Sequence, residues 1–238
     1  MNYCLLLAGG NGTRMGNTGV PKQFLELKNK PIIIWSLENL IKCSAIDKVI
    51  IVCNKPFIPL LAELLKKYNL QDFAEVTAGG KNRLMSAVRG IKYIERTYGI
   101  NDKDIVLAHD SVRMFTDTRI FNENIENAKK YGAATTVFYL EETILEAGDD
   151  GLLFKAHPRE KRFSGQSPQT FNIKEFMECF DKLSDEQKDT FTDLAEVLYV
   201  NGEKVYPVIG SKGNLKITTP IDMVIAELRI DGKGYGFN

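Results

Sequence analysis

The stretch LAGGNGTRMGNTGVPKQ, residues 7–23, is rich in glycine and follows directly on the apolar run YCLLL at residues 3–7. An apolar run that ends in glycines is typical of the first strand of a parallel α/β sheet, where the next loop lies at the ligand-binding edge. Glycines in such a loop let the main chain approach phosphate oxygens closely. The stretch therefore predicts a Rossmann-like α/β fold with a phosphate-binding loop after its first strand.

The spacing of the glycines separates this loop from two other phosphate-binding loops. From Gly10 the chain reads GNGTRMG, which is one residue longer than the dinucleotide motif GxGxxG, and the P-loop motif GxxxxGK[ST] is absent from the sequence. Arg14 and Lys22 add two cations, which indicates an anion whose charge increases during a reaction. The alternative is a tight glycine turn with solvated charges.

Apolar runs and helical stretches alternate along the first 139 residues. Runs rich in Ile, Val and Leu predict strands at 3–7, 48–53, 74–78, 105–108 and 135–139, and helical periodicity predicts helices at 31–42, 56–68, 83–98 and 119–130. This order is typical of a mostly parallel sheet flanked by helices and buried on both faces. At 238 residues, we expect the whole chain, 1–238, to form a single domain.

The pattern changes after residue 139. Two polar strand-like runs surround GDDG at 148–151, which predicts a protruding β-hairpin arm at about 140–165. Helices are then expected at 173–182 and 192–200 and a strand at 204–209. The last helix should begin at Thr219, with Pro220 in its first turn and Asp222 completing a capping box. Thr190 and Asp193 have the spacing of a second capping box.

Charge balance and cysteine use limit the kinds of partner. Lys and Arg total 31, as do Asp and Glu, so no overall field attracts nucleic acid or an anionic membrane, and neither is an expected partner. The four cysteines are widely spaced, which favours reduced core residues of a cytoplasmic protein. Because neither a leader pattern nor an apolar span of membrane length is visible, we expect a soluble, unexported protein.

Several segments, in order along the chain, resemble one enzyme family. They are residues 7–27, GGKNR (79–83), AHDSVRMF (108–115), GQSPQTF (165–171), TDLA (192–195) and GNLKITTPIDM (213–223). The first is similar to the signature of nucleotidyltransferases that join a nucleoside triphosphate to a phosphorylated sugar or polyol. Its PKQ ending resembles the cytidylyltransferases for methylerythritol phosphate and ribitol phosphate. The resemblance implies a nucleotidyltransferase fold, CTP as substrate, Mg²⁺ as cofactor and a homodimer formed through the arm.

Motif positions and this resemblance together select the candidate site residues. Asp110 follows a predicted strand, so its carboxylate should lie at the edge that carries the glycine loop, where Mg²⁺ prefers one or two carboxylates beside substrate phosphates. Asp110 is therefore the expected metal ligand. The resemblance implies catalytic roles for Arg14, Lys22 and Lys216, the last on a short strand before the final helix. It implies nucleotide contacts from Leu7, Ala8, Gly9, Gly10, Asn11, Gly12, Gly79, Gly80, Arg83 and Ser86, and acceptor contacts from Arg113, Thr143 and Arg159.

The two histidines are expected to be structural. His109 precedes Asp110 on an extended segment, so its side chain should point to the opposite side. The attacking group would be a phosphate monoester, whose second pKa of about 6 leaves it largely dianionic at neutral pH. Neither His109 nor His157 is then required as a general base.

The downstream segments indicate which polyol phosphate is the acceptor. ETI at 142–144 and GQSPQTF resemble the enzymes for ribitol 5-phosphate, which is the first expectation, with CDP-ribitol for a cell wall or capsule as product. Enzymes for 2-C-methyl-D-erythritol 4-phosphate, in isoprenoid synthesis, tend to carry a basic residue and then Asp where this chain has Glu141 and Glu142. 2-C-methyl-D-erythritol 4-phosphate is therefore the second expected acceptor, and another alditol phosphate is the third. A CTP-binding protein without turnover, and a transferase using UTP or dTTP with sugar 1-phosphates, are the remaining alternatives.

Overall fold

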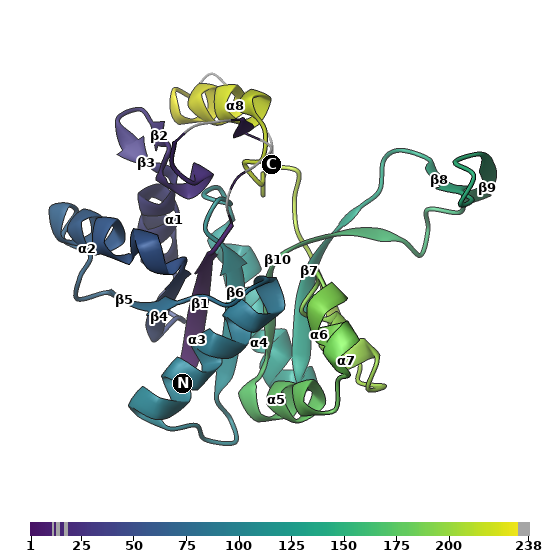
Figure 1. Ribbon diagram of the computed structural model, residues 1–238, viewed down its shortest axis with the longest axis horizontal. Coiled ribbons are helices and arrows are strands. Elements are labelled where there is room, and N and C mark those ends of the chain that lie inside the picture. The colour runs from purple at the N-terminus through teal and green to yellow at the C-terminus, as the bar shows by residue number, and fades with distance from the viewer. Residues whose placement is uncertain (11, 13–14, 17–18, 233–238) are drawn as a thin grey trace.

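A mostly parallel sheet lies at the centre of the molecule, with helices on both of its faces (Figure 1). The computed structural model describes residues 1–10, 12, 15–16 and 19–232, so the candidate residues Asn11 and Arg14 lie outside the described part. Within that part the main sheet has seven strands in the order β11-β7-β10-β6-β1-β4-β5, and only β10 runs antiparallel to its neighbours. The strands are β1 (Asn2–Ala8), β4 (Lys48–Cys53), β5 (Ala74–Ala78), β6 (Ile105–Asp110), β7 (Ala133–Tyr139), β10 (Phe163–Asn172) and β11 (Tyr206–Ile209).

The central strands are buried on both faces because their apolar side chains alternate between two clusters. On β1, Leu5 packs with Val52 on one face, whereas Leu6 packs with Ile51 on the other. Helices α3 (Arg83–Tyr98), α5 (Ile173–Asp181) and α7 (Glu196–Tyr199) cover the first face, and α1 (Ile32–Leu40), α2 (Ile58–Lys67) and α4 (Thr118–Tyr131) cover the second. The predicted fold class, a Rossmann-like sheet flanked by helices, is confirmed.

Short elements complete the chain. They are the 3-10 helices η2 (Lys22–Phe24) and η3 (Lys55–Phe57), the strand pair β2 (Glu26–Leu27) and β3 (Lys30–Pro31), and helices α6 (Asp185–Thr190) and α8 (Pro220–Ile230). Helix α8 begins as predicted, because the Asp222 carboxylate accepts hydrogen bonds from the backbone and side chain of Thr219. Among the helices of the described residues, none is both long and apolar enough to cross a membrane.

The strand of the main sheet that sequence reasoning missed is β10, which lies between β6 and β7. Its sequence, FSGQSPQTFN, contains Gly165, Pro168 and several polar residues, all of which weaken a strand pattern. The chain accommodates Pro168 at an irregularity, because the pairing with β7 shifts register between Gly165 and Gln169. The inserted strand places Gln169 opposite Ala108 of β6, two residues from Asp110.

Three further expectations are wrong. The helix expected at 192–200 is confined to α7, and α6 precedes it, beginning at a capping box formed by Ser184 and Gln187. The capping box of Thr190 and Asp193 does not form, because Thr190 ends α6 and its hydroxyl donates to the Glu186 carbonyl. The short strand expected around Lys216 is also absent, since residues 210–219 form an irregular loop between β11 and α8.

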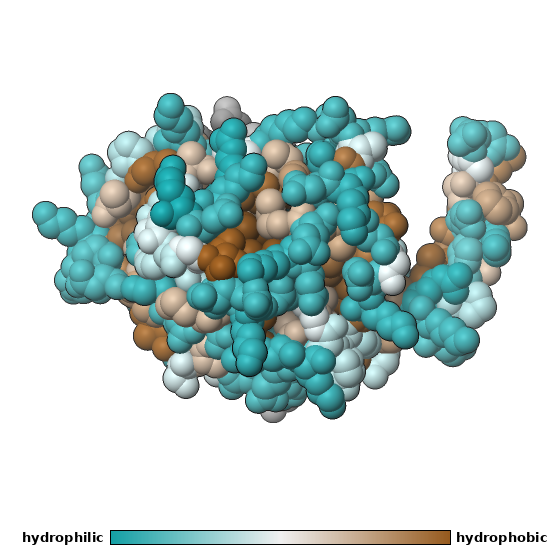
Figure 2. Space-filling model, turned by 90° about the horizontal axis from the view of Figure 1, so that it is seen from below, coloured by the Kyte–Doolittle hydropathy of each residue, from teal (hydrophilic) through white to brown (hydrophobic). Residues whose placement is uncertain are grey.

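The predicted arm extends beyond the sheet. Strands β7 and β10 continue outward together as far as the pair Tyr139 and Phe163, and the arm ends in a hairpin of β8 (Ile144–Ala147) and β9 (Leu153–His157). Figure 1 shows this hairpin standing apart from the body, and Figure 2 shows hydrophobic residues, in brown, on the surface of the arm. Leu152, Leu153 and Phe154 are each more than 60% exposed. An isolated hairpin that exposes such side chains lacks a core of its own.

Candidate active site

A cavity of about 330 Å³ opens where β1 and β6 end. Its walls come from the glycine loop, η2, the N-terminal turn of α3, the end of β6 and the loop before α8. This is the edge at which open parallel sheets bind ligands. Of the candidate residues, the walls include Leu7, Gly9, Gly10, Gly12, Lys22, Gly80, Arg83, Ser86, Asp110 and Lys216. The sequence therefore identified most of the described lining.

The glycine loop forms one wall. Gly12 has φ +71°, and a Cβ there would lie 3.0 Å from the backbone nitrogen of Lys22, so both conformation and space favour glycine. Lys22 begins η2, lines the cavity and is only 9% exposed. The neighbouring Gln23 fixes this corner to the sheet, because its side-chain amide donates to the carbonyl of Ala8 at 2.6 Å.

The N-terminal turn of α3 forms the opposite wall. The Asn82 side chain caps the helix by accepting a hydrogen bond from the backbone of Met85 at 2.8 Å. The Ser86 hydroxyl accepts from the Gly80 backbone at 3.0 Å and donates to the Asn82 carbonyl at 2.8 Å. A Cβ on Gly80 would lie 2.6 Å from the carbonyl carbon of Met85. The N-terminus of α3 thus borders the cavity, an arrangement that favours anions.

Asp110 lies between three cations. Its Oδ2 lies 3.0 Å from Lys216 Nζ and 3.4 Å from Arg113 Nε, and its Oδ1 lies 3.5 Å from Arg83 Nε. Burial by itself raises the pKa of this carboxyl, but Arg83, Lys216 and Arg113 outweigh it and hold the pKa far below its usual range. Asp110 is thus ionised at every pH at which the protein would work. With Lys22 and Lys81 also in the walls, cations outnumber this one carboxylate among the described lining residues.

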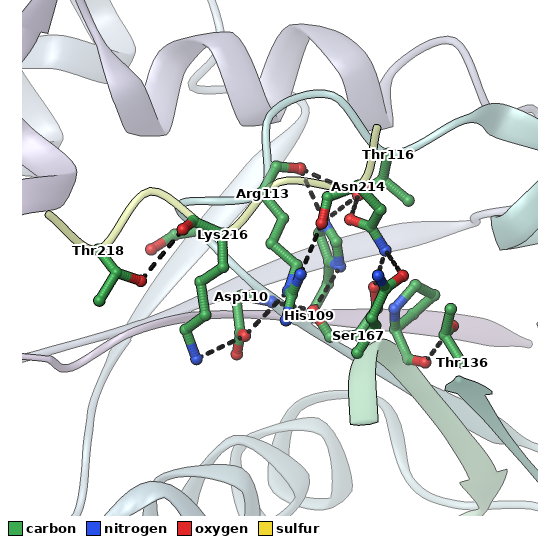
Figure 3. Close-up of polar contacts among 12 residues, drawn as sticks. His109, Asp110, Arg113, Thr116, Thr136, Ser167, Asn214, Lys216 and Thr218 are labelled. Carbon is green, nitrogen blue, oxygen red and sulfur yellow. Dashed lines mark hydrogen bonds and ion pairs between the residues drawn. The ribbon is translucent and has the colours of Figure 1, made fainter. Parts of the chain in front are cut away.

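His109 lies behind Asp110, on the buried side of β6 (Figure 3). Its Nδ1 is 3.1 Å from Ser167 Oγ, its Nε2 is 3.3 Å from Thr116 Oγ1, and its ring meets the edge of Phe121. Burial lowers the pKa of His109 to about 4, so the imidazole is neutral at neutral pH. His157 lies on the arm, where it pairs with Glu146. Both positions agree with the structural roles expected for the histidines.

Asn214, which sequence reasoning missed, fixes the loop that carries Lys216 (Figure 3). Its amide donates to the Ser167 carbonyl at 2.8 Å and accepts from the Thr116 hydroxyl at 2.8 Å. Its own carbonyl accepts from Arg113 Nη1 at 2.6 Å. Asn214 therefore ties three segments together two residues before Lys216. The GNLK motif gave its position, but its partners lie 47 to 101 residues away in the sequence.

The remaining candidates among the described residues do not line this cavity. The Ala8 carbonyl accepts a hydrogen bond from the lining residue Gln23, Gly79 lies beside Ser86, and the buried Arg113 pairs with Asp110. Thr143 and Arg159 lie on the arm and are exposed, with Arg159 donating to the carbonyl of Glu141. Their acceptor roles stay predictions. The cavity also contains Gln23, Lys81, Asn82, Ser111, Val112 and Thr218, of which Asn82 could have been found as a helix cap.

The donor set limits how a metal could bind here. No group of three or more His, Cys, Asp or Glu side chains gathers anywhere in the described part of the chain. Among the described residues that line the cavity, Asp110 alone supplies a carboxylate. Such a site suits Mg²⁺, which is commonly held by one or two carboxylates together with substrate phosphates and water.

Known proteins resemble this chain over nearly its whole length. Residues 3–231 match the family model described as IspD: 2-C-methyl-D-erythritol 4-phosphate cytidylyltransferase. The chain is similar to the crystal structure of 2-C-methyl-D-erythritol 4-phosphate cytidylyltransferase from Francisella tularensis, with 25% identity, 96% of this chain and 99% of that chain covered, and a TM-score of 0.80. It also resembles 4-diphosphocytidyl-2C-methyl-D-erythritol synthase from Anaerococcus prevotii, with 24% identity, 97% and 96% coverage and a TM-score of 0.79, a likeness of fold.

A third similar structure is the bifunctional IspDF from Campylobacter jejuni, at 25% identity and a TM-score of 0.71. This chain covers 53% of that protein and 93% of its own length in the match. The family match spans nearly all of the chain, from β1 through α8, and includes every segment that lines the cavity. The chain therefore belongs to the IspD family, whose members are CTP-dependent cytidylyltransferases.

Proposed function

We propose that this enzyme transfers CMP from CTP to 2-C-methyl-D-erythritol 4-phosphate, with release of pyrophosphate. The observation that supports the reaction is the cationic cavity, in which Lys216 and Arg83 pair with the carboxylate of Asp110 and Lys22 is a further lining residue. The family match and the Francisella neighbour support this acceptor over ribitol 5-phosphate, the acceptor expected first from the sequence.

The triphosphate would bind across the glycine loop and the N-terminal turn of α3. Lys22 is nearly buried at the edge of that loop, so its ammonium group acts on a bound phosphate with little screening by water. Main-chain N–H groups of the loop and the helix N-terminus add donors to the phosphate oxygens. The cytosine and ribose would then lie near Gly80 and Ser86, the segment that the family resemblance gives to the nucleoside.

The chemical step needs positioning and charge stabilisation more than proton transfer. A phosphate oxygen of the acceptor forms a bond to the α-phosphorus of CTP, and the bond from that phosphorus to the β-phosphate oxygen breaks. The acceptor phosphate is already largely dianionic at neutral pH, so no general base is needed. Lys216 and Lys22 would stabilise the negative charge that gathers on the α-phosphoryl oxygens and the leaving pyrophosphate. Asp110 would hold Mg²⁺, which supplies further positive charge to the phosphates when bound.

The acceptor would meet residues of the arm. In a single chain, Thr143 and Arg159 lie outside the cavity. We therefore propose a homodimer in which the arm of one subunit carries these side chains to the cavity of its partner. The exposed Leu152, Leu153 and Phe154 support an arm that packs against another chain.

Ribitol 5-phosphate is the second candidate acceptor. Glu141 and Glu142 stand where methylerythritol phosphate enzymes tend to carry a basic residue and Asp, and GQSPQTF resembles the ribitol phosphate enzymes. Because both acceptors are acyclic polyol phosphates, the reaction and the roles of the cations are the same for either.

The test is pyrophosphate release from CTP and Mg²⁺ with the two acceptors side by side. We expect kcat/KM to be at least tenfold higher with methylerythritol 4-phosphate, a difference of about 1.4 kcal/mol in transition-state binding. A preference for ribitol 5-phosphate would replace the acceptor and leave the cytidylyl transfer intact. UTP, dTTP and ATP in place of CTP test the nucleotide, and EDTA tests the metal requirement. No turnover with any polyol phosphate would refute the assignment.

A further inference from the structure

A chain of polar contacts leads from Arg83 away from the cavity. The Arg83 guanidinium lies between two acceptors, because its Nη1 donates to Gln169 Oε1 at 2.8 Å and its Nη2 lies 3.5 Å from Asp110 Oδ1. The contact with Gln169 is the shorter one. Gln169 is therefore the main fixed point for this guanidinium in the described structure, even though it does not line the cavity itself.

The amide of Gln169 has its orientation imposed by Asp193. Gln169 is 2% exposed, and its Nε2 donates to Asp193 Oδ1 at 2.7 Å and to Thr135 Oγ1 at 3.1 Å. An ionised carboxylate can only accept hydrogen bonds, so the NH₂ group must face Asp193 and the carbonyl oxygen must face Arg83. A flipped amide would direct its two N–H donors at the guanidinium, which has no acceptor to meet them.

Asp193 is itself held in place by the segment between α6 and α7. Its Oδ1 also accepts from the backbone of Ala195 at 2.7 Å. The preceding helix is attached to the cavity wall, because the Asn82 amide donates to the Lys188 carbonyl at 2.8 Å and Lys81 pairs with Asp189. The segment, the amide and the guanidinium thus form one connected support that reaches the cavity.

We propose that Asp193, acting through Gln169, is a positioning residue that directs Arg83 toward the bound nucleotide. The inference rests on the proposed cytidylyl transfer, in which Arg83 touches CTP. It gives the TDLA motif a role that differs from the capping box expected from its spacing. Neither Asp193 nor Gln169 touches substrate in this assignment, so both are separate from the catalytic residues.

A double-mutant cycle tests this role. We would compare Asp193→Ala, Gln169→Met and Arg83→Met, alone and as pairs with Arg83→Met, by kcat and KM for CTP. Asp193→Ala and Gln169→Met should each lower kcat/KM for CTP by about tenfold, mostly through KM. In the Arg83→Met background neither should cause a further loss, because the group that they position is gone. Losses that multiply in the double variants would overturn the proposal.

Three measurements keep the outcome specific. Asp193→Asn retains an oxygen that can accept from both Gln169 and Ala195, so it should recover most of the activity that Asp193→Ala loses. Thr135→Val removes the other partner of the same amide and should change kcat/KM by less than about twofold. A thermal melt will show whether Asp193→Ala folds. If it does not, the double-mutant cycle is measured with Gln169→Met and Arg83→Met. CTP binding to the wild type, measured without acceptor, separates the two proposals. If CTP does not bind, the nucleotide assignment is refuted. If CTP binds but the losses multiply in the double variants, only the positioning role is refuted.

Discussion

At the residue scale, Lys216 is the cation with the most direct relation to Asp110. In the sequence, only family resemblance distinguishes this lysine from a solvated one, whereas in the fold its 3.0 Å contact with Asp110 does so. We predict that Lys216→Ala lowers kcat on the order of a hundredfold, as expected when one charge-stabilising donor is removed. Steady-state pyrophosphate release would measure it, with Lys92→Ala on the exposed face of α3 as control. Equal activity of the two variants would contradict the assignment.

His109 gives the protein a predictable response to acid. Its pKa is about 4 in the folded chain and about 6.5 when unfolded, so between these values the unfolded chain binds more protons. Above pH 6.5 His109 should therefore not lower the free energy of unfolding. As the pH decreases from 6.5 toward 4, protonation of this residue in the unfolded chain should lower that free energy by about 3 kcal/mol. Urea unfolding from pH 7.5 to 4.5, without added metal, would measure the slope.

A His109→Gln variant is the matched comparison. Glutamine keeps hydrogen-bonding groups near Ser167 and Thr116 but does not titrate in this range. The variant should be less stable than wild type at pH 7.5 and lose less stability on acidification. An unchanged slope would show that other groups cause the acid response.

At the element scale, the N-terminal turn of α3 depends on a close backbone approach at Gly80. A Cβ at this position would lie within 2.7 Å of three atoms of Met85, two of them backbone, so an alanine must displace the turn that carries Arg83. We predict that Gly80→Ala lowers the melting temperature and raises KM for CTP at least tenfold. Gly10→Ala is the control for stability, because a Cβ there meets no atom of the described residues within 4 Å. Equal melting temperatures would contradict the predicted strain.

The strands show which elements could be predicted from the sequence and why. Strands β1 and β4 were found almost residue by residue because each is an apolar run between turn residues, buried on both faces. The edge strand β5, which is only partly buried, was also predicted with its observed bounds. The long strand β10 was missed because its polar residues serve partners across the sheet: Gln169, for example, bonds residues 24 and 86 positions away. Local pattern therefore predicted most of the elements and the family resemblance predicted most candidate residues of the cavity, whereas the contacts that orient those residues required the fold.

For the whole molecule, the arm determines whether the site is complete in one chain. Sequence reasoning assigned Arg159 and Thr143 to the same site as the cavity residues, but in the single chain both lie outside the cavity. Replacing the exposed Leu152, Leu153 and Phe154 by Ser should leave the body folded, since they lie outside its apolar clusters. We predict that the triple variant is a monomer by light scattering and loses more than 90% of its activity, roughly a 1.4 kcal/mol effect or larger. A fully active monomer would refute the shared site.

Complementation between two inactive variants would test the shared site most directly. Lys216→Ala removes a cavity residue and Arg159→Ala removes an arm residue, so each pure dimer should be nearly inactive. In a mixed dimer, the arm of the Lys216→Ala subunit can reach the intact cavity of the Arg159→Ala subunit. After random subunit exchange we expect about a quarter of wild-type activity, because half of the dimers are mixed and each has one complete site. If each arm served its own cavity, mixing would restore nothing, since no subunit would then carry both residues.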